Sequence, residues 1–469
     1  MKSTKIDSTI QRELEKLLAQ YPLVTTIVAQ LHARGAQALL VGGAVRDLLM
    51  GLPVKDLDIE VHGLTLDELD DVLRQFGVVS MVGKAFGVLR LHGLDSDWSL
   101  PRTDQSGRKP VVSLDPHLPL KEAFARRDLT MNAMGIDLVT YELIDPFHGY
   151  DDIRAGILRT PNPTFFVEDP LRFYRVMQFI GRFAMQPDDE LTAVCKSMDI
   201  SGVSRERIET EFNKLLLKSE NPSLGIRWVH SLGRLAELWP ELGATVGVPQ
   251  NPVWHPEGDV FEHTMQALDG GTRLSYTDVH EKLIIMYALL CHDLGKVDTT
   301  VEIDGIFKSP NHAQSSVVHA RTLLARITHN HDIVDAVLKL VACHMEPGQF
   351  VSGNAQAAAY KRLARKLAPH VTLEMLAQLA LADKRGRNPN SHEPLIVPIP
   401  DVDKFIEYAK QYAVLEHAEP PVLQGKDFLD HVAPGPQLGE LVRLAYKLQI
   451  DEGITDKEEL KQRVLSSVS

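Results

Sequence analysis

Two aspartates one residue apart, Asp56 and Asp58, open a β-branched run that has the pattern of a strand. Residues i and i+2 of a strand point to the same face, so we expect the two carboxylates to stand side by side. Like charges that close repel each other unless a cation lies between them. Mg²⁺ takes oxygen ligands and is completed by substrate phosphates, so the pair predicts a magnesium site for phosphate chemistry. The alternative is that one aspartate caps a turn and the other faces water.

A glycine turn precedes the two aspartates. The stretch "QALLVGGAVRD" predicts a short strand, a turn at Gly42 and Gly43, and a helix that carries Arg46. Backbone N–H groups at such a turn can hold phosphates, and Arg46 would add a fixed positive charge. Most glycine turns before helices only make the turn. The interpretation as a phosphate site therefore depends on Asp56 and Asp58, which follow within twenty residues.

Two arginines and an aspartate stand together in "RRDLTMNAM", at the entry to an apolar segment. Arg126 and Arg127 suit a triphosphate or an RNA backbone, because guanidinium groups bind phosphate oxygens well. The alternative for Asp128 is that it caps a helix whose first turns are "DLTMNAM". Both roles are compatible, since a cap at a helix start is a rigid place from which to present a carboxylate.

A further carboxylate and guanidinium pair occurs in "EDPLR". Asp169 before Pro170 is a good N-cap, and on the residues alone capping is the better interpretation. Asp169 and Arg172 nevertheless lie three residues apart at a predicted helix start, where their side chains can converge. Cytosine and adenine share an amine donor beside a ring-nitrogen acceptor, which a carboxylate and a guanidinium match. Uracil and guanine present the opposite pattern and would leave polar groups unpaired.

The second half of the chain carries histidines and aspartates in the order H…HD…H…H…D. These residues are His263, His292, Asp293, His312, His344 and Asp383. Neutral imidazole and carboxylate are ligands for divalent transition metals. A lone histidine in a helix is more often a packed or surface residue, but six such residues in this order are hard to explain by packing. The pattern predicts a second metal site, where Lys296 of "HDLGK" is placed to meet a phosphate.

The elements that must position these residues form an α/β part followed by a helical part. Residues 8–35 predict a helix or helix pair, "DLDIEVHG" and "FGVLRLHG" predict strands, and the segment between them predicts a helix. After Pro146 the helical period dominates. Segments 247–259 and 386–401 are rich in proline or glycine and predict domain boundaries.

Composition places the chain among ordinary globular proteins, with 44% hydrophobic and 24% charged residues. Its start has no apolar secretory region, and no apolar run approaches the length of a membrane helix. Three cysteines, too few for a disulfide framework, fit a reducing compartment, so we expect a cytoplasmic protein. The net charge of −13 argues mildly against a nucleic-acid coat but allows a local basic groove. No pattern predicts an oligomeric state.

The ordered motifs resemble those of nucleotidyltransferases related to DNA polymerase β. The similarity is specific to bacterial class II tRNA nucleotidyltransferases (CCA-adding enzymes) and their poly(A) polymerase relatives. It rests on "GGAVRD", "DLDIEV", "RRDLTMNAMGID" (126–137) and "EDPLRFYRV" (168–176). It implies an α+β fold, with a polymerase-β-like head of mixed sheet and helices followed by an all-α neck and body. The implied domains are a head over 1–145, a base-recognising neck over 146–246, an HD domain over 247–400 and a C-terminal helical region over 401–469.

The resemblance also implies roles for individual residues. Asp56 and Asp58 would hold Mg²⁺, and a third catalytic carboxylate would be Asp97, or Asp95 as the near alternative. This third stretch, "DSDWSLPRTD", departs from the commoner Glu-Val-Ala-Thr-Phe-Arg form. Asp128 would accept from a ribose hydroxyl. The implied nucleotide-binding residues are Gly42, Gly43, Arg46, Arg126, Arg127, Asp128, Asn132, Asp169, Arg172 and Arg175, with Asp169 and Arg172 as the amino-acid template for CTP and ATP.

The histidine and aspartate series is similar to the HD phosphohydrolase superfamily. That similarity implies a divalent transition metal held by His263, His292, Asp293 and Asp383, with His312 and His344 for a second metal or a phosphate. Related domains are associated with metal-dependent phosphatase and 2′,3′-cyclic phosphodiesterase activity.

The leading hypothesis is therefore addition of CCA to the 3′ end of tRNA from CTP and ATP. The alternatives are addition of CC or A alone, poly(A) synthesis, an HD phosphohydrolase with an RNA-binding head, and a non-catalytic RNA-binding protein. The basic run of Lys361, Arg362, Arg365 and Lys366 is expected on a solvated helix face, more plausibly a solubilising surface than a tRNA footprint.

Overall fold

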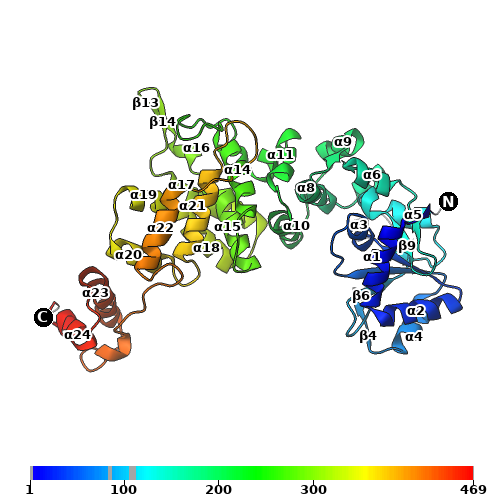
Figure 1. Ribbon diagram of the computed structural model, residues 1–469, viewed down its shortest axis with the longest axis horizontal. Coiled ribbons are helices and arrows are strands. Elements are labelled where there is room, and N and C mark those ends of the chain that lie inside the picture. Colours follow the sequence, from blue (N-terminus) through cyan, green and yellow to red (C-terminus); the bar gives the residue numbers. More distant parts are fainter. Residues whose placement is uncertain (1–3, 83–86, 105–111, 468–469) are drawn as a thin grey trace. The chain divides into compact units, whose positions relative to one another are not determined.

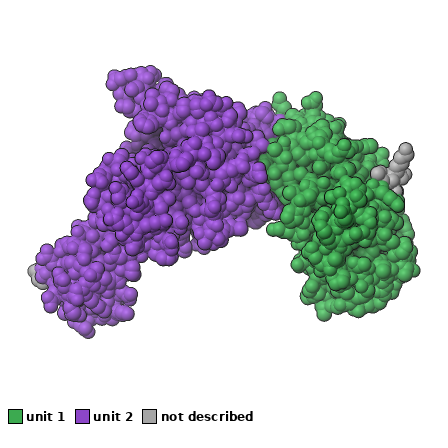
Figure 2. Space-filling model, in the orientation of Figure 1, with its two compact units in different colours: residues 1–204 green, residues 205–469 purple. Residues whose placement is uncertain are grey.

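The computed structural model describes residues 4–82, 87–104 and 112–467. The chain forms two compact units, residues 1–204 and 205–469, which are described separately (Figures 1 and 2). The boundary between them falls inside the expected neck, 146–246. The limits of the four expected domains stay predictions.

A mixed eight-stranded sheet forms the centre of the first unit, in the order β1-β10-β9-β2-β3-β6-β5-β4. Only β3 and β6 pair in parallel, and the other neighbours are antiparallel. This confirms the expected mixed sheet. The strands are β1 (Thr4–Lys5), β2 (Gln37–Val41), β3 (Leu57–His62), β4 (Val79–Val82), β5 (Val88–Leu91), β6 (Ser96–Ser99), β9 (Gly135–Asp137) and β10 (Glu142–Ile144).

Helices cover both faces of this sheet. On one face the core includes Leu14, Ile27 and Leu69, from three different helices, packed against alternate residues of the central strands. On the other face Phe124 packs with Leu39 and the remaining alternate residues of β2. The helices of this unit are α1 (Ser8–Ala19), α2 (Pro22–Ala33), α3 (Gly43–Leu49), α4 (Leu66–Arg74), α5 (Leu120–Ala125), α6 (Gly149–Ala155), α7 (Pro163–Phe166), α8 (Leu171–Phe183) and α9 (Asp189–Ser197). Short pairs β7–β8 (Arg102–Asp104, Val112–Leu114) and β11–β12 (Ile157–Leu158, Gln186–Pro187) complete it.

Strand β3 fixes which face carries the carboxylates. Leu57, Ile59 and Val61 are buried in the main core. Because side chains alternate along a strand, Asp58 and Glu60 must point to the opposite face. Asp56 immediately precedes the strand rather than lying within it.

The second unit is built mainly from helices. Helices α14 (Val260–Thr272), α15 (Val279–Cys291), α17 (His312–Ile327), α18 (His331–Cys343) and α21 (Leu373–Arg385) pack on one another. Around them lie α10 (Arg205–Lys218), α11 (Ser223–Ser231), α12 (Leu235–Leu238), α13 (Pro240–Gly243), α16 (Lys296–Thr299), α19 (Glu346–Ser352), α20 (Ala357–Leu367) and α22 (Pro400–Gln411). A hairpin of β13 (Val301–Ile303) and β14 (Ile306–Lys308) is its only sheet among the described residues.

The C-terminal helices have a small core of their own, which includes Phe428, Leu441 and Leu460. They are α23 (Pro436–Glu452) and α24 (Lys457–Ser466). Lys361 of α20 forms an ion pair with Glu419 at 2.5 Å.

The expectation that the basic run of α20 lies on a solvated face holds for Arg362, Arg365 and Lys366, which are exposed, whereas Lys361 is partly buried. This face also contacts the C-terminal segment. Arg362 pairs with Asp451, and the Arg365 guanidinium lies 5.1 Å from the Tyr446 ring centre. The helical period locates a polar face, but it does not say what packs against that face.

Within the described ranges no helix combines the length and the apolar character that crossing a membrane requires. Cys195, Cys291 and Cys343 are buried, and none forms a disulfide bond within the part of the chain that the structure describes.

Gly295, in the turn between α15 and α17, allows the first turn of α17 to approach closely. A Cβ there would lie 2.3 Å from the Ser316 nitrogen and 2.4 Å from the His312 carbonyl oxygen. We predict that Gly295→Ala lowers the free energy of unfolding by about 1–3 kcal/mol, measured by urea denaturation, because backbone must move. Gly348→Ala within α19 is the matched control, since its Cβ would meet only the Lys384 Nζ at 3.9 Å. An equal loss in both variants would contradict the prediction.

Candidate functional site

The first candidate site lies where β3 and β6 run side by side. Asp58 and Asp97 are direct partners in these parallel strands, so their side chains share a face. Arg90 on β5 is the next residue across and donates to both Asp97 carboxylate oxygens, at 2.7 and 2.8 Å. Asp95 precedes β6 and contributes its carbonyl oxygen to the Leu57 N–H. The geometry thus favours Asp97 over Asp95 as the third carboxylate, although its role stays a prediction.

The charges around Asp58 suit a divalent cation. Partial burial raises the pKa of Asp58, and the negative charges of Asp97 and Asp56 raise it further. The positive charge of Arg127 opposes this shift. The positive charge of the nearby arginines therefore does not fully compensate the three carboxylates. Oxygen ligands of this kind fit Mg²⁺.

Gly42 closes one side of this site. Its backbone has φ +68°, in the left-handed region that favours glycine. A Cβ there would lie 2.9 Å from the Arg127 Nη1 and 3.9 Å from the Asp58 Oδ2. The turn thus depends on a glycine both for its conformation and for its approach to these two side chains. Gly43 begins α3 beside the Arg46 guanidinium.

Glu60, which the sequence did not single out, holds the two predicted phosphate-binding arginines. Its carboxylate lies 3.4 Å from the Arg127 Nη2 and 3.7 Å from the Arg126 Nη2. Burial raises the pKa of Glu60, but the hydrogen bond from His62 and the arginine charges outweigh it, so the pKa is lowered. An ionised, buried carboxylate therefore pairs with both guanidinium groups, and Arg127 also lies close enough to lower the pKa of Asp58.

A buried chain of hydrogen bonds joins α3, the residues near 130 and α8. The Arg46 Nη1 donates to Asn132, and Asn132 donates to Asp128, which also accepts from the Arg175 Nε at 2.6 Å. Burial opposes ionisation of Asp128, yet Arg175 and Asn132 lower its pKa to about 2. The alternative that Asp128 caps an α-helix is wrong, because only a single 3₁₀ turn, Thr130–Asn132, follows.

Asp169 and Arg172 lie at the start of α8. The Asp169 carboxylate accepts the Leu171 N–H at 3.2 Å, as the capping interpretation expects, although the residue at the N-cap position is Pro170. Arg172 donates to the carbonyl oxygens of Phe165 and Arg126. The structure therefore ties Arg172 to the backbone, and base recognition by this pair stays a prediction.

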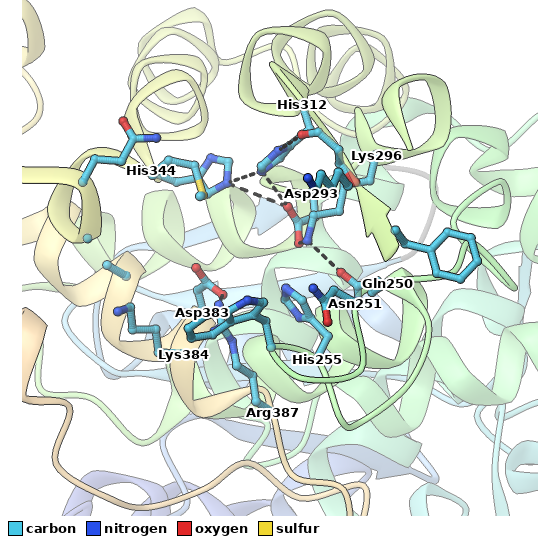
Figure 3. Close-up of a pocket in the computed structure, with 18 of the residues that line it drawn as sticks. Gln250, Asn251, His255, Asp293, Lys296, His312, His344, Asp383, Lys384 and Arg387 are labelled. Carbon is cyan, nitrogen blue, oxygen red and sulfur yellow. Dashed lines mark hydrogen bonds and ion pairs between the residues drawn. The ribbon is translucent and has the colours of Figure 1, made fainter. Parts of the chain in front are cut away.

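The second candidate site brings together all six predicted histidines and aspartates of the helical unit, from helices α14, α15, α17, α18 and α21 or the turns at their ends. Figure 3 shows four of them, Asp293, His312, His344 and Asp383. The Asp293 Oδ2 lies 3.3 Å from the His292 Nε2 and 3.6 Å from the His263 Nε2. Its Oδ1 lies 3.3 Å from the His312 Nε2 and 3.8 Å from the His344 Nε2. Asp293 thus bridges two groups of ligand atoms. Asp383 lies beside the first group, with its Oδ1 3.1 Å from the His263 Nε2.

Three of these histidines are oriented by backbone carbonyls. The Nδ1 atoms of His292, His312 and His344 lie 2.7, 2.8 and 2.7 Å from the carbonyl oxygens of Leu289, Ser309 and Val341. A carbonyl oxygen only accepts, so each Nδ1 carries the hydrogen and each Nε2 is left for the centre of the cluster.

This arrangement fits divalent metal ions. The Nε2 atoms of His312 and His344 face each other at 3.1 Å, although both are acceptors when the rings are neutral. The Asp293 Oδ1 is buried without a hydrogen-bond partner. A cation beside these atoms would satisfy all three, and imidazole with carboxylate suits a transition metal.

Electrostatics keep the carboxylates ready to bind a cation. Burial opposes ionisation of Asp293, but Lys296 and His292 lower its pKa well below the usual value. Burial and the charge of His292 lower the pKa of His344 to about 3, so this imidazole is neutral near pH 7. Burial lowers the pKa of His263, but hydrogen bonds with Asp383 and Glu257 outweigh it and raise that pKa to about 9. A metal would displace this proton.

A pocket of about 530 Å³ opens over Asp293, His312, His344 and Asp383 (Figure 3). Its walls carry four cationic side chains, Lys296, Lys308, Lys384 and Arg387. The Lys296 Nζ also lies 2.7 Å from both the Asp293 Oδ2 and the Gln250 Oε1, which fixes its ammonium group at the histidine and aspartate cluster. Trp254 lines the same pocket with 65% of its surface exposed. The pocket suits a phosphate ester with an apolar or aromatic group attached.

Glu60, Glu257 and His255 were not predicted as site residues from the sequence. Glu60 lies inside an apolar strand pattern, and the other two lie in the proline- and glycine-rich segment that we interpreted only as a boundary. The dense "WHPEGD" within that segment was the available signal, because histidine and carboxylate there precede His263.

Comparison with known proteins gives consistent matches. Residues 38–159 match the family described as Poly A polymerase head domain. A multifunctional CCA protein of Methylobacillus flagellatus is 36% identical over 65% of this chain and 72% of its own length. A multifunctional CCA protein of Halorhodospira halophila is 32% identical over 86% of this chain and 94% of its own length.

Solved structures share the fold at low identity. The Thermotoga maritima CCA-adding enzyme in complex with tRNA is 20% identical, with a TM-score of 0.58 over 99% of this chain and 97% of that chain. The Bacillus stearothermophilus CCA-adding enzyme in complex with CTP is 21% identical, with a TM-score of 0.66 over 95% of this chain and 96% of that chain.

The low pKa of Asp128 predicts a pH-dependent contribution to stability. A carboxyl whose pKa falls from 3.8 to about 2 on folding contributes stability that is fully present above about pH 4 and is lost as pH falls toward 2. We expect Asp128→Asn to lower the free energy of unfolding by about 2 kcal/mol at pH 7, with a smaller difference at pH 3. Urea denaturation at both pH values measures this. A difference that grows as the pH falls would contradict it.

Proposed function

Because this chain belongs to the family of multifunctional CCA proteins, we propose that it adds CCA to the 3′ end of tRNA, using CTP and ATP. The observation that carries the proposal is the register of Asp58 beside Asp97, next to the Gly42 turn. Asp56 completes the group that would hold Mg²⁺. The cytoplasmic location expected from the sequence stays a prediction.

In the proposed reaction the 3′-hydroxyl of the tRNA attacks the α-phosphorus of the nucleoside triphosphate. A P–O bond forms to the tRNA, the bond to the β-phosphate oxygen breaks, pyrophosphate leaves and the hydroxyl proton passes to solvent. Mg²⁺, when bound, activates the hydroxyl and stabilises the leaving pyrophosphate. Arg126 and Arg127, fixed by Glu60, would bind the triphosphate.

Base selection is proposed for the start of α8. The Asp169 carboxylate would accept from the amine of cytosine or adenine, and Arg172 would donate to the ring nitrogen. In this structure Arg172 donates to the carbonyl oxygens of Phe165 and Arg126, so it would have to redirect one N–H to a base. Asp128, held by Asn132 and Arg175, would accept from the ribose.

Incubation with Mg²⁺, labelled CTP and ATP, and tRNAs ending before C, after CC and after CCA tests this proposal. We expect addition that stops at CCA and falls about a thousandfold or more in Asp58→Ala, because the cation loses a ligand. Asp71→Ala, an exposed change on α4, is the control and should keep activity. Addition of CC alone, A alone or a long A tract would identify a related activity instead.

A second function is supported by Asp293, which faces both groups of ligand atoms. We propose that His263, His292, Asp293 and Asp383 hold one divalent transition metal, and that Asp293, His312 and His344 hold a second. The site would then hydrolyse a phosphate ester, adding water across a P–O bond. A bound metal would supply the nucleophilic hydroxide. Lys296 and the other cations that line the pocket would hold the phosphate.

Hydrolysis of 2′,3′-cyclic AMP in the presence of Mn²⁺, Co²⁺ or Ni²⁺ tests the second function. We expect chelator-sensitive release of a phosphomonoester that Asp293→Asn abolishes, because the shared ligand is weakened. CCA addition should be unaffected by that change, and Asp58→Ala should show the reverse pattern. Hydrolysis that survives Asp293→Asn would contradict the assignment.

A further inference from the structure

Glu257 lies in the loop before α14, and its side chain is completely buried. Its Oε1 lies 2.7 Å from the Nδ1 of His263 and 2.9 Å from the Nδ1 of His255. A carboxylate only accepts, so both imidazoles donate through Nδ1. One oxygen therefore orients a histidine of the metal-ligand cluster and a histidine that lines the pocket.

His263 needs a side-chain partner for a structural reason. His292, His312 and His344 lie at helix ends, and each donates to the carbonyl three residues before it. His263 instead lies inside α14, where the backbone carbonyls belong to the helix. Besides Glu257, its Nδ1 reaches only the carbonyl oxygen of Gly386, at 3.0 Å, among the contacts of the described residues.

We propose that Glu257 is a positioning residue for the metal site: its carboxylate holds the Nδ1 hydrogen of His263 and so directs the Nε2 of His263 at the metal. This inference rests on the second proposed function. A ligand histidine whose other nitrogen donates to a carboxylate has a fixed ring orientation and greater basicity, and loss of that partner typically weakens metal binding 10- to 100-fold. Glu257 would not touch the substrate.

His255 allows the role of Glu257 to be separated from general damage to the loop. The His255 and His263 rings meet edge to face, with centroids 4.7 Å apart, and share the same carboxylate oxygen. Removing His255 leaves the bond between Glu257 and His263 in place. Removing the charge of Glu257 weakens that bond while His255 stays. We therefore expect the change at Glu257 to weaken metal binding and the change at His255 to leave it unaltered.

The test is binding of Co²⁺ alone to the full chain. Equilibrium dialysis measures the dissociation constant, and visible absorption reports the coordination of the bound ion. We expect Glu257→Gln to raise the dissociation constant about 10- to 100-fold and to change the absorption spectrum. His255→Ala should keep both close to the parent. Glu262→Gln is the matched control, because Glu262 lies in the first turn of α14 and pairs with Arg227 instead. CCA addition by each variant shows that the chain is folded.

An unchanged Co²⁺ affinity and spectrum in Glu257→Gln, with binding lost in Asp293→Ala, would overturn the inference and leave the second function standing. An equal loss in Glu257→Gln and His255→Ala would also overturn it, because the loop rather than the carboxylate would then support the site. Failure of the parent protein to bind Co²⁺ would overturn the second function together with the inference.

Discussion

Both sites of this chain depend on packed apolar residues that hold charged and polar side chains close together. Leu57, Ile59 and Val61 bury one face of β3, so Asp58 cannot turn away from Asp97 without exposing them. In the second unit, His292 and Asp293 follow the C-terminal part of α15, in which residues 283–291 are all buried. The free energy that keeps the polar side chains in place therefore comes from burial of the apolar residues on the same strands and helices.

Much of the first site follows from local sequence. The sequence predicted that Asp56 and Asp58 lie on one face of a strand, but only Asp58 lies within β3 and Asp56 precedes it. The glycine pair correctly predicted a tight turn. Glu60 could not be found this way, because a buried carboxylate is stable only beside partners such as Arg126 and Arg127, which lie far along the chain. Asp128 shows the converse error: the local sequence has the pattern of a capped α-helix, but the segment after it forms only a 3₁₀ turn.

The second site was predicted from residue types, and the structure shows why that was possible. Its side chains come from helices and turns spread over more than a hundred residues, but each is of a type seldom buried without a partner. The pattern could not indicate Glu257, whose importance comes from contacts with His263 and His255 rather than from its spacing. It also could not show that the basic face of α20 packs against the C-terminal segment, because periodicity contains no information about partners.

The carbonyl groups that orient His292, His312 and His344 affect how this cluster responds to amino-acid substitution during evolution. A backbone carbonyl is present whatever amino acid the codon specifies, so substitutions of Leu289, Ser309 or Val341 leave these supports in place as long as the helix ends persist. His263 is different, because a change in a single codon can remove its carboxylate. Substitution of the buried Leu289 or Val341 would disturb the core but leave the supporting carbonyl in place, whereas substitution of Glu257 removes the supporting group itself.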